Sequence, residues 1–70
     1  MLEIPIQRES GEAIYLQVAA HLRRLIGSGA LSPGTRLPGT RVLSRQLDIS
    51  RTTVMQAYAI LENDGKIRLE

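Results

Sequence analysis

The chain lacks several features that would point to particular protein classes. It contains no cysteine, which excludes disulfide bonds and thiolate metal sites. No apolar run approaches the roughly 20 residues that a membrane-spanning helix needs, and the N-terminus lacks the basic start and long apolar stretch of a secretory signal. Only two aromatic residues occur, Tyr15 and Tyr58, too few for the base-stacking surface of a single-strand nucleic-acid binder. We therefore expect one small cytoplasmic domain with an aliphatic core.

Groups suited to catalysis are also missing from the sequence. The acidic residues are scattered and form no pair spaced for acid–base chemistry, and no nucleophile has a neighbouring base. His21 is the only histidine and has no cysteine or acidic partner at ligand spacing, so we expect no metal site. No glycine-rich loop suited to cradling a phosphate is present. The sequence therefore predicts a protein that is not an enzyme.

The basic residues are few but unevenly placed. The formal net charge is only +2, yet eight of the nine basic residues are arginines. Four of them, Arg36, Arg41, Arg45 and Arg51, lie between positions 36 and 51, where Asp48 is the only acid. Guanidinium groups suit bidentate contacts with phosphate and guanine. With so few aromatic residues, this distribution favours double-stranded DNA as the partner.

Hydrophobic periodicity predicts a first helix that begins at Ile14 and ends at Gly27-Ser28-Gly29. At about 100° per residue, most of its apolar side chains fall within a stripe roughly 140° wide. Gln17 lies outside that stripe, and so does Leu16, which is a mild misfit. Residues 1–12 mix alternating apolar residues with residues typical of turns. We expect an N-terminal arm there, flexible or an edge strand, that is not part of the core, and a domain over residues 13–70.

A second helix is predicted to begin at Gly39 or Thr40, because Pro38 disfavours helix at the residue before it. A tight turn follows this helix, and in it Asp48 occupies a position that needs the left-handed conformation, which Asp tolerates better than most residues. Ser50 then caps a third helix. Two helices joined by three or four residues form a helix-turn-helix, whose second helix lies in the DNA major groove.

The third helix, residues 50–64, has one apolar face and one polar face. The apolar stripe consists of Val54, Ala57, Tyr58 and Leu61. Thr52 and Gln56 lie on the opposite face, with Met55 beside them. Residues 66–70 then alternate in the manner of a strand, and no return strand follows them. Because an edge strand needs a partner, we expect pairing with residues 2–6, with another chain, or with residues absent from this sequence.

Three segments resemble the GntR family of bacterial transcription regulators: Tyr15-Leu16-Gln17-Val18, Pro33-Gly34-Thr35-Arg36-Leu37-Pro38 and Ser50-Arg51-Thr52-Thr53-Val54. The pair Ala57-Tyr58, with Leu61 and Gly65, is similar to the MocR branch. The resemblance implies a mainly α winged helix-turn-helix with three helices and a short β wing, here incomplete. It also implies binding to double-stranded operator DNA as a homodimer when the protein is full length.

In the MocR branch the DNA-binding domain precedes a large domain related to pyridoxal-phosphate aminotransferases. No cofactor is assigned to this chain, because Lys66 is its only lysine and lies in the expected wing. Pyridoxal phosphate would belong to a C-terminal domain absent from this sequence, so we expect a truncated DNA-binding domain. Two positions depart from the family: Gly39 stands where Ser is usual, and Met55 where many relatives carry Arg.

Eight residues are candidate DNA contacts: Arg36, Arg41, Arg45, Ser50, Arg51, Thr52, Thr53 and Gln56. The resemblance assigns contacts to Arg36, Arg41, Arg51, Thr52 and Thr53. For Thr53 the alternative is that its side chain only supports the first turn of the helix.

The alternative for the whole domain is a winged-helix module that binds another protein, with an arginine face that only solvates the surface. The resemblance favours DNA binding, and retention on duplex DNA discriminates between the two hypotheses.

Overall fold

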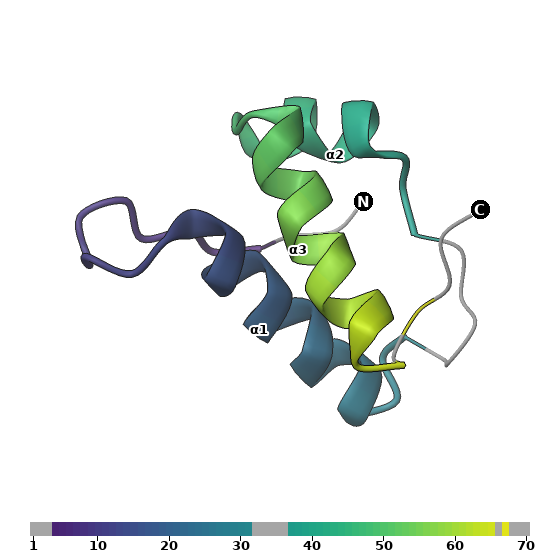
Figure 1. Ribbon diagram of the computed structural model, residues 1–70. Helices are drawn as coiled ribbons and strands as arrows, with labels where there is room; N and C mark the ends of the chain where they lie inside the picture. The colour runs from purple at the N-terminus through teal and green to yellow at the C-terminus, as the bar shows by residue number, and fades with distance from the viewer. Residues whose placement is uncertain (1–3, 32–36, 66, 68–70) are drawn as a thin grey trace.

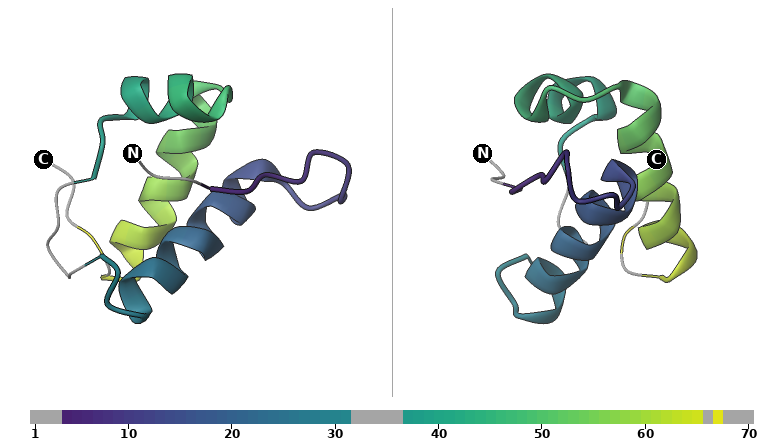
Figure 2. Two further views of the ribbon diagram at one scale, coloured as in Figure 1. Left: turned by 180° about the vertical axis from the view of Figure 1, so that it is seen from behind. Right: turned by 90° about the vertical axis from the view of Figure 1, so that its left-hand side faces the viewer.

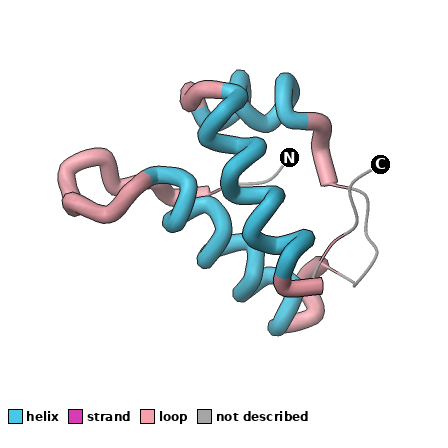
Figure 3. Tube along the Cα trace, in the orientation of Figure 1, coloured by secondary structure: helices cyan, strands magenta, loops and turns pink. Residues whose placement is uncertain are grey.

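The computed structural model describes residues 4–31, 37–65 and 67. It contains three helices: α1 (Ile14–Gly27), α2 (Thr40–Leu47) and α3 (Arg51–Asn63) (Figure 1). The described ranges contain no strand (Figure 3). The predicted mainly α architecture and all three helices are therefore confirmed. The strand expected at residues 66–70 lies outside the described residues, apart from Ile67, which is buried.

Helix α3 is the centre of the packing. It contacts both α1 and α2, whereas the backbones of α1 and α2 do not approach each other. Figures 1 and 2 show α2 lying across the N-terminal end of α3, whereas α1 lies along α3. The buried apolar side chains of the helices are Val18, Ala19, Leu22, Leu43, Val54, Ala57, Tyr58 and Leu61. The stripe predicted on the third helix is thus confirmed.

The helix boundaries follow from local chemistry. Helix α1 ends at Gly27, where Ser28 and Gly29 follow and Gly29 adopts a positive φ of 86°. Such a conformation is inexpensive only for glycine, which is why helices so often stop there. Helix α2 begins at Thr40 after Gly39, which supplies no side-chain cap. A serine at this position, usual in the family, would add a side-chain acceptor for the first turn of α2.

The N-terminal arm differs from the prediction. Ile4 is buried and belongs to the core, and Ile6 packs against it. The expectation that residues 1–12 stay outside the core was therefore wrong, because the apolar side chains of Ile4 and Ile6 pack with those of the helices. The division into an arm (1–12) and a domain (13–70) stays a prediction.

Gln17 also differs from the prediction. It was expected outside the packed stripe, yet only 8 % of it is exposed. Its side-chain amide accepts a hydrogen bond from the Gln7 backbone N–H at 2.8 Å and donates to the Gln7 and Glu12 carbonyls at 2.9 Å. A buried amide is tolerated when its polar atoms are paired in this way. The arm supplies those partners and loops back just ahead of α1 (Figure 1).

Candidate nucleic-acid interface

The turn between α2 and α3 has the conformation that the sequence predicts. Asp48 is the only described residue other than glycine with positive φ, at φ 56° and ψ 50°, the left-handed region. Its N–H and that of Ile49 both donate to the Ser44 carbonyl, which closes the C-terminal end of α2. The left-handed residue changes the direction of the chain within three residues, so that α3 leaves the turn across α2 (Figure 1). The two helices thus form a helix-turn-helix.

The first turn of α3 is capped by Ser50. The Ser50 Oγ accepts a hydrogen bond from the Thr53 N–H at 3.1 Å and lies 2.8 Å from the Thr53 Oγ1. The two hydroxyl groups therefore hydrogen-bond to each other. This is the arrangement expected if the Thr53 side chain supports the first turn of α3. Among the described residues, no acceptor meets the N–H groups of Arg51 and Thr52. These two donors point outward from the positive end of the helix dipole, where anions are favoured.

The arginines of the helix-turn-helix are exposed and have no partner among the described residues. The side chains of Arg41 and Arg45 on α2, and of Arg51 on α3, are exposed to solvent. Across residues 4–31, 37–65 and 67, none of these three guanidinium groups forms an ion pair or an intramolecular hydrogen bond. Arg23, by contrast, pairs with Asp64 at 2.6 Å. The three cations of the helix-turn-helix are therefore available to an anionic partner.

The remaining candidates divide into two groups. Thr52 and Gln56 are exposed on α3, opposite its buried stripe, and Met55 beside them is 54 % exposed. Thr53 is half-buried and engaged in the cap. Arg36 lies outside the described residues.

Two contacts that position the site were not predicted. The Tyr58 hydroxyl donates a hydrogen bond of 2.7 Å to the Pro38 carbonyl, which ties α3 to the segment that leads into α2. Burial raises the pKa of Tyr58 to about 12. The Arg8 guanidinium donates to the carbonyls of Leu47 and Asp48 at 3.2 and 3.0 Å. No sequence motif marks either contact, because both join residues at least 20 positions apart.

The described residues contain no cluster of three or more His, Cys, Asp and Glu side chains that would hold a metal ion. None of the helices in the described part of the chain has the length and apolar character needed to cross a lipid bilayer.

Comparison with known proteins decides the family. Residues 14–70 match the model of bacterial regulatory proteins of the gntR family. The chain belongs to the gntR family. Its three helices form the DNA-binding domain of a GntR-family transcription factor, a regulator domain and not an enzyme. The protein-interaction alternative is therefore set aside.

Individual relatives agree with this assignment. The chain is 39 % identical over 64 residues to the HTH-type pyridoxine biosynthesis transcriptional regulator PdxR of Corynebacterium glutamicum. This match covers 91 % of the chain and 14 % of PdxR. It is 40 % identical over 60 residues to the HTH-type transcriptional repressor NagR of Bacillus subtilis. This match covers 86 % of the chain and 25 % of NagR. The chain thus spans a quarter or less of these two relatives.

A solved structure supports the fold. The GntR-family transcription factor YtrA from Sulfolobus acidocaldarius superposes with a TM-score of 0.90 at 39 % identity. The match covers 96 % of this chain and 71 % of that one. The winged helix-turn-helix fold predicted from the sequence is confirmed by this likeness, although the wing itself falls among residues that the structure does not describe.

Proposed function

We propose that the domain binds a specific operator in double-stranded DNA by inserting the N-terminal half of α3 into the major groove. One observation carries the proposal: in the first turn of α3, the Arg51 guanidinium group and the N–H groups of Arg51 and Thr52 have no partner among the residues that the structure describes. A helix end of this kind attracts phosphate through its N–H groups, while its side chains reach base edges.

Each remaining candidate has a distinct role in the proposal. Arg51 hydrogen-bonds a base, with guanine O6 and N7 as its natural acceptors, and Thr52 contacts a thymine methyl or a phosphate. Gln56, one turn further along α3, reaches an adenine edge. Arg41 reads or holds the duplex from α2, and Arg36 and Arg45 contact the phosphate backbone.

The hydroxyls of Ser50 and Thr53 are engaged with each other and serve mainly to hold the first turn of α3 in shape. Met55 is exposed on α3. It offers an apolar contact with a thymine methyl instead of a hydrogen bond.

Three broader statements belong to the same proposal. The similarity to PdxR supports placement in the MocR branch. A single domain of this size offers few base contacts, so we propose that the full-length protein binds as a homodimer and gains affinity from two linked half-sites. Its place of action is the bacterial cytoplasm, where operator DNA lies.

Salt dependence tests the electrostatic part of the proposal. With about five phosphate contacts, the logarithm of the binding constant falls with the logarithm of salt concentration at a slope of about −4.5. The measurement is a fluorescence-anisotropy titration of a labelled random duplex at several salt concentrations. A flat response would contradict a role for the arginine face.

Sequence preference requires a second measurement. Rounds of selection from a random duplex pool by the 70-residue chain yield an enriched duplex, and competition against random DNA measures the preference. Equal affinity for selected and random duplexes would show that the domain binds DNA without reading its sequence.

A further inference from the structure

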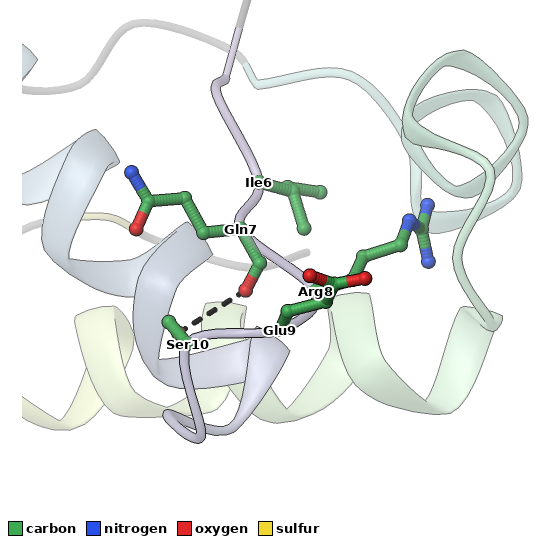
Figure 4. Close-up of a pocket in the computed structure, with 5 residues that line it drawn as sticks. All are labelled: Ile6, Gln7, Arg8, Glu9 and Ser10. Carbon is green, nitrogen blue, oxygen red and sulfur yellow. Dashed lines mark hydrogen bonds between the residues drawn. The ribbon is translucent and has the colours of Figure 1, made fainter.

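The N-terminal arm is fastened to α1 by a set of polar contacts. The buried side chain of Gln17 on α1 holds the backbone of Gln7 on both its N–H and its carbonyl. The Ser10 hydroxyl donates to the same Gln7 carbonyl at 3.1 Å (Figure 4). On the N-terminal side, Ile4 and Ile6 are anchored in the core. The segment that carries Arg8 is therefore held in place on both sides.

From this fixed segment Arg8 reaches the turn between α2 and α3. Figure 4 shows its side chain extending away from the arm toward α2. Arg8 is one of the residues, 6–10, that line a hollow at the arm. Its Nη2 donates to the Leu47 carbonyl at 3.2 Å and the Asp48 carbonyl at 3.0 Å. These carbonyls end α2, where the helix dipole is negative and a cation is favoured. Charge assistance makes such hydrogen bonds stronger than neutral ones.

The position of these acceptors gives the contact its significance. The backbones of α1 and α2 do not approach each other, whereas α3 contacts both helices, and the Tyr58–Pro38 hydrogen bond ties α3 to the segment that precedes α2. The hydrogen bonds of Gln17 and of Arg8 form a further connection, which links α1 through the N-terminal arm to the C-terminal end of α2. Leu47 and Asp48 lie only four and three positions before Arg51 in the sequence.

We infer that Arg8 is a positioning residue for DNA recognition: by holding the carbonyls of Leu47 and Asp48, it fixes the angle at which α3 leaves the turn. The inference rests on the proposed function, because the orientation of α3 affects binding only if α3 enters the major groove. It assigns no DNA contact to Arg8. A well-placed helix end loses less freedom on binding, which raises affinity without adding a contact to the duplex.

The test compares three variants of the 70-residue chain: Arg8→Ala, Arg8→Lys and, as matched control, Arg24→Ala. Arg24 is exposed on α1 and pairs with no group in the described residues, so its loss removes the same charge without touching the turn. The probe is the duplex enriched from a random pool by the unchanged chain. Binding is measured by anisotropy at several salt concentrations, and the thermal midpoint by circular dichroism.

We expect Arg8→Ala to weaken binding of the selected duplex about three- to tenfold relative to Arg24→Ala, with the same slope against salt. Arg8→Lys, which keeps a cationic donor, restores part of the affinity. A slope shallower by about 0.9 in Arg8→Ala alone would mean that Arg8 holds a phosphate, and it would overturn the inference. Affinity equal to that of Arg24→Ala, or a loss of affinity fully matched by unfolding, would overturn it as well.

Failure of the proposed function is distinguishable from failure of the inference. If the unchanged chain enriches no duplex, the DNA proposal fails, and the role of Arg8 is then judged from amide NMR spectra of the free chain. Arg8→Ala is expected to shift the signals of Ile49, Arg51 and Thr52, whereas Arg24→Ala leaves them in place. Unchanged signals in Arg8→Ala would contradict a positioning role.

Discussion

Replacing Tyr58 with phenylalanine keeps the ring in the core and removes only the hydroxyl that bonds the Pro38 carbonyl. Tyr58 is 3 % exposed, and its hydrogen bond is 2.7 Å long. A neutral hydrogen bond contributes about 0.5–1.5 kcal/mol to folding. We expect Tyr58→Phe to lower the free energy of unfolding by about 1 kcal/mol at neutral pH, which lowers the melting midpoint of a domain this small by about 4–8 °C.

The same residue predicts a loss of stability in alkali. Burial raises the pKa of Tyr58 from the usual 10.0 to about 12 in the folded chain. Above pH 10 the Tyr58 hydroxyl therefore ionises in the unfolded chain before it ionises in the folded chain. Its contribution to the free energy of unfolding is complete below pH 10 and is lost as the pH approaches 12. By pH 11 the free energy of unfolding should be lower by about 1.4 kcal/mol than at pH 8 on this account alone.

The assay is urea denaturation followed by circular dichroism at pH 8 and pH 11. Wild type should lose more stability between the two conditions than Tyr58→Phe does. Tyr15→Phe is the matched control, because Tyr15 is only partly buried and has no hydrogen bond of its hydroxyl within the described ranges. Equal alkaline losses in wild type and Tyr58→Phe would refute the reasoning.

Three further substitutions test the helix-turn-helix. Arg51→Ala should cost about 1–3 kcal/mol of binding to a selected duplex and reduce the preference over random DNA; competition titration measures both, and an unchanged preference contradicts the assignment. Ser50→Ala removes the cap of α3 and should lower the free energy of unfolding by about 1 kcal/mol, measured by urea denaturation. Asp48→Gly should stabilise the fold by up to about 1 kcal/mol, because φ at this position is 56°; a lower melting midpoint would show that the Asp48 side chain matters more than its backbone.

Much of the helix-turn-helix could be predicted from the sequence because local chemistry determines it. Pro38 restricts where α2 begins, Ser50 caps α3, and Asp48 tolerates the left-handed turn between them. Periodicity alone identified the buried face of α3. These signals act within a few residues, so a single sequence is enough to recognise them.

The contacts that were missed join distant parts of the chain. Gln17 looked polar and exposed by its position on the helix, yet the arm folds back and satisfies its amide. Arg8 and Leu47 are 39 positions apart, and nothing in the local sequence of either residue indicates the other. The three arginines of the helix-turn-helix are exposed as expected, and their common use on DNA stays a prediction.

The most direct test of the central claim is amide NMR mapping of the isotope-labelled chain with the selected duplex. We predict that the largest shift changes fall at Arg41, Arg51, Thr52 and Gln56, while Arg23 on α1, paired with Asp64, changes little. Shift changes concentrated on α1, with the first turn of α3 unaffected, would contradict the placement of α3 in the major groove.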